Sequence, residues 1–146
     1  GGIATGAAVA AVLAAGARGA QLGTAFMLCP EAGTAPGHRA ALASSRETTL
    51  TRAFTGRLAR GIRNTFIDEH ERHAPIAYPE LHHLTAPLRA RARERGDAES
   101  VNLWAGQTHA LALELPAAEV LSRLAEDARA SLSTLAELLP PPPGQP

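Results

Sequence analysis

Two glycine-rich segments decide the fold: Gly1-Gly-Ile-Ala-Thr-Gly6 and Gly19-Ala-Gln-Leu-Gly-Thr24. Between them, Thr5 to Gly16 has apolar side chains at helical spacing, with its first residue suited to an N-cap and its last to a helix end. The second segment opens a short apolar run, Gly19 to Leu28, which predicts a buried strand followed by a loop. The order of glycine loop, helix, strand and glycine loop indicates consecutive βα units of an α/β fold.

The two glycine segments also predict a phosphate site. Glycine permits left-handed backbone, and successive free N–H groups at a strand end or helix N-terminus form a concave anion site. In a (β/α)8 barrel, the loops after the seventh and eighth strands frequently bind phosphate, and Gly1-Gly2 and Gly23-Thr24 occupy comparable places here. Alternatively, each glycine only makes a turn or a close helix–strand contact, and spacing alone does not decide between the two.

Composition excludes several classes of partner. The 146 residues include fourteen basic residues, all of them Arg, and fourteen acidic ones, so no net charge attracts nucleic acid or an anionic membrane. With 3% aromatic residues, a stacking platform for nucleic acid is not expected. The most apolar stretch, Gly6 to Ala17, is shorter than a membrane span requires. A single cysteine excludes an internal disulfide and suits the cytoplasm. The chain has no initial Met, so we expect the protein to begin upstream.

Downstream of the glycine segments, the sequence predicts a mostly helical region. Short helices are expected at His38 to Ser45 and Thr65 to His73, with an extended segment at Leu50 to Gly56. The clearest amphipathic pattern runs from Pro116 to about Leu135 and predicts a closing helix. We therefore expect a barrel segment at 1–50, a mostly helical extension at 51–139 and a disordered or polyproline-like tail at 140–146.

One further helix is expected to begin at Thr85 as its N-cap and to end near Arg95, before Gly96. Pro87 would then lie in its first turn, where its missing N–H is tolerated. Leu88 is expected to face inward, and the arginines of the helix to face solvent.

The amino-acid sequences of these segments resemble those of a known family. Gly1 to Gly6, followed by Ala15 to Phe26, resembles the last two βα units of the nitronate monooxygenases, formerly the 2-nitropropane dioxygenases. Three later segments are similar to the C-terminal extension of the bacterial members: 51–64, 78–89 and 103–107. The glycine motif alone is shared with other flavin barrels. Arg52-Ala-Phe-Thr-Gly56 and Leu103-Trp-Ala-Gly-Gln107 are what narrow the assignment, and the resemblance extends to about Leu132.

The resemblance implies the C-terminal part of a (β/α)8 TIM barrel with a helical extension, in an FMN enzyme. Such an enzyme oxidises alkyl nitronates with dioxygen to a carbonyl compound and nitrite. It acts on small molecules, and a homo-oligomer is expected. The residues implied to bind the cofactor are Gly1, Gly2, Gln21, Leu22, Gly23 and Thr24. The implied catalytic histidine matches no segment here, so we expect it upstream and expect this chain alone to be inactive.

Two alternatives remain open. One is a related flavin-dependent enoyl reductase, which would consume NAD(P)H; the segment from Leu103 to Gln107 disfavours it. The other is a non-catalytic helical module, in which the exposed edge of an incomplete barrel pairs with another chain.

Other candidate residues have simpler interpretations. His70 and His73, with the nearby His82 and His83, could form a zinc site, but solvent-facing histidines are the simpler explanation, and no metal is expected. Cys29 lacks an evident activating group and is interpreted as structural. Tyr78 and Trp104 could line a substrate entrance but are more often core residues. The row formed by Arg57, Arg60 and Arg63 could attract anions, although such rows are usually solvated.

Overall fold

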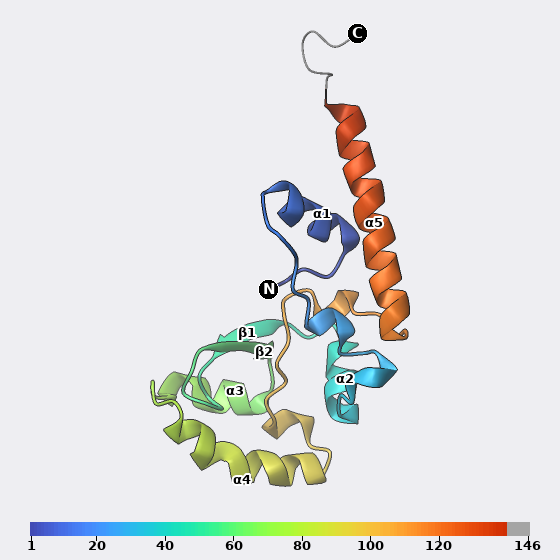
Figure 1. The fold of residues 1–146 in the computed structure, drawn as a ribbon. Helices are drawn as coiled ribbons and strands as arrows, with labels where there is room; N and C mark the ends of the chain where they lie inside the picture. The colour runs from blue at the N-terminus through green and yellow to red at the C-terminus, as the bar shows by residue number, and fades with distance from the viewer. Residues whose placement is uncertain (140–146) are drawn as a thin grey trace, which may run out of the picture.

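A computed structural model describes residues 1–139 and is mostly helical (Figure 1). The α-helices are α1 (Gly6–Ala14), α2 (Pro36–Leu42), α3 (Thr65–His70), α4 (Glu80–Glu94) and α5 (Ala117–Leu138). Two strands, β1 (Thr48–Thr51) and β2 (Ala59–Ile62), form an antiparallel sheet with Thr48 opposite Ile62 and Thr51 opposite Ala59. Short 3-10 helices are η1 (Thr24–Phe26), η2 (Pro30–Ala32), η3 (Glu71–His73), η4 (Ala98–Ser100) and η5 (His109–Leu111).

The upper part of the molecule consists of α1 packed against the long helix α5 (Figure 1). The Thr5 hydroxyl accepts a hydrogen bond from Ala8 N at 3.2 Å and so caps α1. Gly6 allows the two helices to approach closely, because a Cβ at this position would lie 2.3 Å from the Cβ of Asp127 and 2.6 Å from the carbonyl oxygen of Leu124. At the lower end of α5, Val120 and Leu124 pack with the buried Cys29.

The lower part of the molecule is built around the β1–β2 hairpin, α3 and α4 (Figure 1). One core cluster stacks Phe54 on Phe66, with ring centroids 4.6 Å apart, and the Trp104 ring meets Phe54 edge-on. A second cluster includes Leu42, Ile62 and Leu103. The extended segment around Trp104 joins the two clusters, because Leu103 belongs to the second cluster and Trp104 packs against the first. This segment pairs with β2 through an isolated bridge between Trp104 and Gly61.

Several sequence predictions are confirmed. α1 lies within the predicted range, Thr5 is its N-cap, and Gly16 follows it with a φ of +96°. α3 and η3 together cover the predicted helix from Thr65 to His73. α5 matches the predicted closing helix and begins after Pro116. The helix predicted at His38 to Ser45 is present but begins two residues earlier, as α2.

Other predictions are wrong for this chain. Gly19 to Leu28 forms no strand: its first residues are largely exposed, and η1 follows them. A strand of a parallel sheet needs neighbouring strands for its hydrogen bonds, and the described residues place none beside this segment. The extended segment predicted at Leu50 to Gly56 is displaced, because β1 ends at Thr51 and a turn follows.

The start of α4 was also predicted wrongly. The helix begins at Glu80, after the cis Tyr78–Pro79 peptide bond, so Pro87 lies inside it. Thr85 is therefore no N-cap; its buried hydroxyl donates to the carbonyl oxygen of Phe54. Leu88 is 46% exposed and does not face the core of this chain, whereas Arg89, one of the arginines expected to face solvent, is buried.

The boundary between residues 50 and 51 stays a prediction, and the tail predicted at 140–146 lies outside the described residues. Within residues 1–139, no helix is both long enough and apolar enough to span a membrane.

Candidate functional site

The structure brings most of the predicted cofactor-binding residues to one cavity of about 410 Å³ near the N-terminus, here called the glycine cavity. Its walls are formed by Gly1, Gly2, Ile3, Gln21, Gly23, Thr24, Arg60, Ala105, Gly106, Gln107 and Thr108. Leu22 does not line it, because its side chain packs towards Val120 and Leu124 instead. The cavity therefore joins the two segments singled out in the sequence with a third, at 105–108.

Local backbone conformation shapes the first wall of the cavity. Gly2 has a φ of +83°, in the left-handed region that side chains disfavour, and it directs the chain towards α1. On the neighbouring wall, Gly23 precedes the single turn η1, which begins at Thr24. The first N–H groups of any helical turn lack partners within that turn. Backbone donors and the Thr24 hydroxyl are thus available at this wall.

The third wall depends on pairing with β2. Ile62 N donates to the carbonyl oxygen of Leu103 at 2.8 Å, and Ala105 N donates to that of Arg60 at 3.2 Å. These bonds carry the chain to Gly106, whose N–H donates to the Thr24 hydroxyl at 2.9 Å. A Cβ at Gly106 would lie 3.6 Å from Gly2 N, so the three segments meet closely at this point.

The cavity favours a negatively charged group. Arg60 is the charged side chain on its walls, and no carboxylate within residues 1–139 lines it. The Arg60 guanidinium also donates to the carbonyl oxygen and hydroxyl of Thr48, at 3.3 and 3.1 Å, so β1 holds it in place. Glycine backbone, hydroxyl donors and one guanidinium form a donor set that fits a phosphate group.

Sequence reasoning missed Arg60 and residues 105–108 as parts of this site. The segment that contains Gly106 is nevertheless distinctive in sequence, because Leu103-Trp-Ala-Gly-Gln107 is one of the segments that carry the family resemblance. Its location could not be predicted, because β2 was not predicted and the pairing between β2 and this segment is what positions Gly106.

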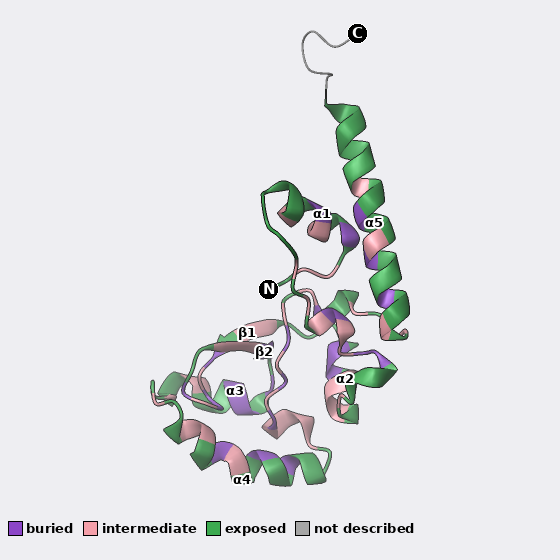
Figure 2. Cartoon of the chain, viewed as in Figure 1, coloured by how far each residue is buried: buried purple, intermediate pink, exposed green. Residues whose placement is uncertain are grey.

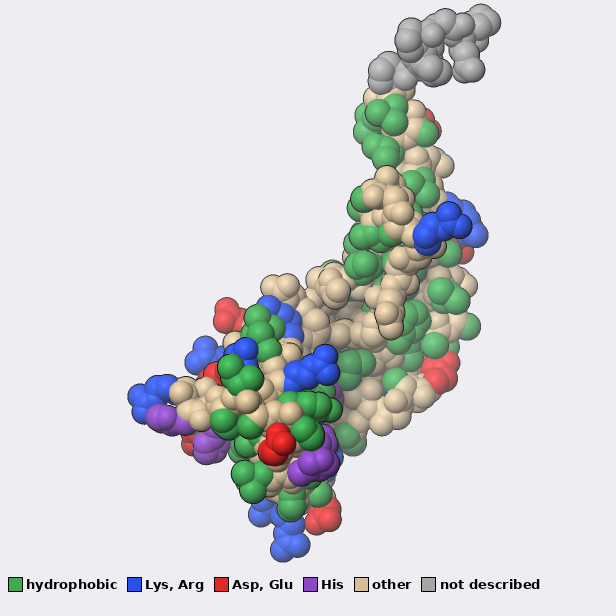
Figure 3. Space-filling view, turned by 60° about the vertical axis from the view of Figure 1, so that its left-hand side comes forward, with side chains coloured by type: hydrophobic (Ala, Val, Ile, Leu, Met, Phe, Trp, Pro, Cys, Tyr) green, Lys and Arg blue, Asp and Glu red, His purple; other side chains and the backbone are tan. Residues whose placement is uncertain are grey.

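The cysteine and histidine candidates lie in surroundings that do not favour a reactive or metal-binding role. Cys29 is buried, and burial raises the pKa of its thiol, with Glu31 adding to the effect, which disfavours the reactive thiolate. Arginines and histidines are prominent over the lower part of the molecule (Figure 3). However, residues 1–139 contain no group of three or more His, Cys, Asp or Glu side chains placed to hold a metal ion. His109 is buried between the carbonyl oxygens of Leu42 and Arg46 and acts as a structural link.

The aromatic candidates differ in their surroundings, and so do the arginine candidates. Trp104 is half-buried and packs on Phe54, whereas Tyr78 is 55% exposed, with the Arg57 guanidinium 5.9 Å from its ring centroid. Arg63 forms an ion pair with Asp68 at 2.6 Å. Of the three arginines in the predicted row, only Arg60 reaches the glycine cavity.

Comparisons with known proteins point to one family. The nitronate monooxygenase family model matches residues 1–127. A nitronate monooxygenase of Paraburkholderia phytofirmans is 41% identical over an alignment of 140 positions, which covers 92% of this chain and 38% of that protein. One of Pseudomonas aeruginosa is 42% identical over an alignment of 134 positions, which covers 88% of this chain and 38% of the relative. The chain thus spans somewhat over a third of the length of these curated relatives.

Solved structures show the same partial coverage. A nitroalkane oxidase of Streptomyces ansochromogenes superposes with a TM-score of 0.91 and 50% identity, over 92% of this chain and 40% of that structure. FabK of Thermotoga maritima superposes with a TM-score of 0.78 and 25% identity, over 95% and 46%. Both are TIM-barrel enzymes, so the predicted fold, the C-terminal part of a (β/α)8 barrel with a helical extension, is confirmed. The chain belongs to the nitronate monooxygenase family.

Proposed function

We propose that this chain supplies the phosphate-binding part of an FMN site in an enzyme that oxidises alkyl nitronates with dioxygen to a carbonyl compound and nitrite. The observation that carries the proposal is the convergence of Gly2, Thr24 and Gly106 on one cavity with Arg60 on its wall. Family membership supports the reaction class. The alternatives of an enoyl reductase and of a non-catalytic module have less support, because the curated relatives above are named nitronate monooxygenases.

The phosphate of FMN fits the cavity for electrostatic and steric reasons. A dianion is stabilised by backbone N–H groups and by the guanidinium of Arg60, and the missing side chains at Gly2 and Gly106 leave the backbone accessible. Gln21, Gln107 and Thr108 add polar side chains on the same walls. Leu22, which packs away from the cavity, would contribute only through its backbone.

These residues bind and orient the cofactor. Electron transfer from the nitronate to dioxygen would be supplied by the flavin when bound. No histidine of this chain lines the glycine cavity within residues 1–139, so the group that acts on the substrate would come from another part of the enzyme. Small-molecule nitronates and dioxygen are accordingly the proposed partners, whereas a cytoplasmic location and a homo-oligomer stay predictions.

The phosphate contact can be tested by comparing FMN with riboflavin, which lacks only the phosphate. Flavin fluorescence titrated with the full chain should show FMN binding at least about tenfold tighter than riboflavin, because hydrogen bonds to a charged phosphate contribute about 1.5–3 kcal/mol each. Thr24→Val should reduce this preference at least about threefold. Thr134→Val is the matched control, because this threonine lies on the exposed side of α5 and, among residues 1–139, its side chain bonds only to the Ala130 carbonyl oxygen.

The reaction itself can be tested in a chimera, in which this chain replaces the matching C-terminal region of the Paraburkholderia phytofirmans enzyme. Nitrite release from propionate 3-nitronate should be retained, and Thr24→Val should raise the FMN concentration needed for half-maximal activity. Equal binding of FMN and riboflavin, or an equal response of the two threonine variants, would overturn the proposed phosphate site.

A further inference from the structure

Arg60, the charged side chain on the wall of the glycine cavity, is held by a residue that lies outside the cavity. Its Nη1 donates to Thr48 Oγ1 at 3.1 Å and to the Thr48 carbonyl oxygen at 3.3 Å. Thr48 is in β1 and is not one of the residues that line the glycine cavity. Any role of Thr48 at this site is therefore exerted through Arg60.

The register of the hairpin places these two side chains on one face of the sheet. Leu50 lies opposite Arg60, and Thr48 precedes Leu50 by two residues in β1. Because side chains alternate between the faces of a strand, Thr48 and Arg60 are diagonal neighbours on the same face, at a separation that a long side chain spans. Thr49 lies opposite Gly61, on the other face. The contact between Thr48 and Arg60 thus follows from the pairing of β1 with β2.

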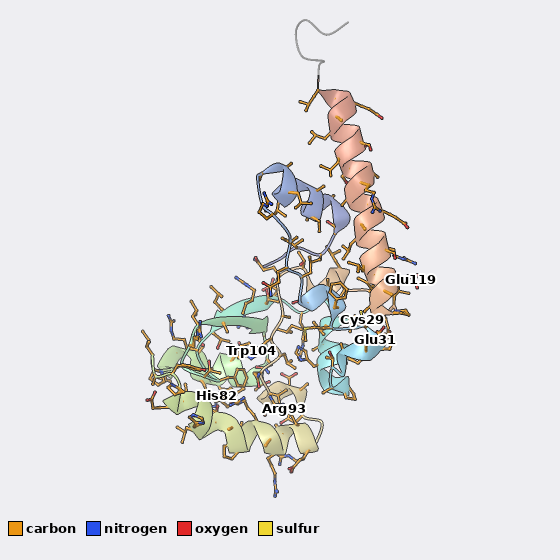
Figure 4. All side chains as sticks on the ribbon, in the orientation of Figure 1. Cys29, Glu31, His82, Arg93, Trp104 and Glu119 are labelled. Carbon is orange, nitrogen blue, oxygen red and sulfur yellow. The ribbon has the colours of Figure 1, made fainter. Side chains whose placement is uncertain are left out.

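The backbone of Arg60 is fixed from the other edge of β2. Ala105 N donates to the Arg60 carbonyl oxygen at 3.2 Å. Gly61 permits this close approach, because a Cβ there would lie 3.0 Å from the carbonyl oxygen of Leu103 and 3.1 Å from the Trp104 ring. Figure 4 shows Trp104 beside the hairpin. β2 therefore has a backbone partner on each edge, and the position from which the Arg60 side chain starts is fixed.

The contact with Thr48 leaves the other donors of the Arg60 guanidinium available. Within residues 1–139, Nε and Nη2 of Arg60 make no hydrogen bond, and Arg60 forms no ion pair with a carboxylate. Nε and Nη2 lie on one edge of the planar guanidinium, and such an edge can donate to two oxygens of one phosphate. An arginine that is already anchored through Nη1 loses less rotamer freedom when it binds an anion.

We infer that Thr48 is a positioning residue for phosphate recognition, whose hydroxyl orders the Arg60 guanidinium before the phosphate binds. The inference rests on the proposed function, because it requires the phosphate of FMN to bind in the glycine cavity. It goes further by assigning a role to a residue that does not line this cavity. It also makes the affinity for the phosphate depend on the register of the hairpin.

Thr48→Val tests this role with little change in shape. Valine has nearly the same shape as threonine and is favoured in strands, so the hairpin should be kept while the hydroxyl acceptor is lost. The full chain would be titrated with FMN and with riboflavin, followed by flavin fluorescence. The preference for FMN should fall about threefold, because the guanidinium must then be ordered during binding. Riboflavin has no phosphate, so its affinity should stay unchanged.

Two further variants separate positioning from stability of the hairpin. Thr49→Val makes the same substitution one residue along β1, on the face away from Arg60, and should leave the preference for FMN unchanged. Thr48→Ser keeps the hydroxyl and should retain the preference of the unmodified chain. Equal effects of the two valine variants would overturn the inference. So would an equal weakening of FMN and riboflavin binding in Thr48→Val, because that result indicates a purely structural role.

A double variant tests whether Thr48 acts through Arg60. Arg60→Met should lower the preference for FMN at least as much as Thr48→Val does, and combining the two should cause no further loss. A further loss in the double variant would contradict the inference.

The same titrations distinguish this inference from the proposed function. If the unmodified chain binds FMN and riboflavin equally, the proposed phosphate site is wrong, and the role of Thr48 is wrong with it. If the unmodified chain prefers FMN and Thr48→Val keeps that preference in full, the phosphate site stands and only the role of Thr48 is refuted.

Discussion

The upper and lower parts of the molecule are held together in different ways (Figure 2). In the lower part, Phe54, Ile62 and Leu103 are almost completely buried, and the hairpin is hydrogen-bonded to the segment from 103 to 105. In the upper part, α5 meets α1 along one side while apolar side chains elsewhere on it stay exposed, including Leu121 and Leu138. The lower part therefore has its own core, whereas the upper part rests mainly on one close helix pair.

The largest expected effect comes from opening the lower core. Phe54→Ala should lower the free energy of unfolding by about 3–5 kcal/mol, because it removes a fully buried ring that stacks on Phe66 and meets Trp104. Leu121→Ala is the matched truncation in the upper part and should cost about 0.5 kcal/mol or less, since that side chain is 61% exposed. Urea unfolding followed by circular dichroism measures both. Similar losses in the two variants would show that the parts do not differ in this way.

A smaller effect is expected from separating the helices of the upper part. Gly6→Val should lower the free energy of unfolding by about 1–3 kcal/mol, because even a Cβ at this position overlaps the backbone and side chains of α5. Gly19→Val places the same side chain where no atom lies within 4 Å and serves as the control. Proteolysis after Arg18 should become faster in the Gly6 variant alone. If both variants are cleaved at the same rate, α1 is not held by this contact.

The smallest effect is a pH dependence in the lower part. Burial acts to raise the pKa of Glu99, but hydrogen bonds from Thr65 and Arg46 outweigh it, and the net shift is downward. A carboxyl group whose pKa is lower in the folded state contributes stability above its unfolded pKa of about 4.3, and that contribution is lost as the pH falls through the folded value. Unfolding measured between about pH 3 and pH 6 should show this loss, and Glu99→Gln should flatten it. An unchanged profile in the variant would assign the acid sensitivity to other carboxyl groups.

Local signals predicted the elements that depend on local interactions. The N-cap at Thr5, the left-handed glycine at position 16 and the apolar stripe of α5 each act within a few residues, so periodicity and capping were sufficient to find them. Thr85 and Pro87 illustrate the limit of such signals. They resemble a helix start, yet the helix begins at Glu80, and the Thr85 hydroxyl serves a tertiary contact with Phe54.

The strand predicted from Gly19 is absent because, unlike these helices, it depends on partners that are distant in the sequence. An apolar run becomes a strand of a parallel sheet only when other strands provide hydrogen-bond partners, and the described residues provide none at that place. β2 was overlooked because its residues, including Arg60 and Gly61, carry little β propensity. Its pairing with the Trp104 segment is a long-range contact that no local pattern reveals.

By itself, the sequence determined the family, the glycine loops and the main helices, because these depend on the order of residues and on interactions between near neighbours. Only the tertiary structure decided which residues share a site. Gly106 and Arg60 line the same cavity as Gly2 and Thr24. They do so because β2 is hydrogen-bonded to residues 103–105, which lie more than forty positions after β2 in the chain. Such alignment depends on backbone pairing and side-chain packing between distant segments, and these exist only once the chain is folded.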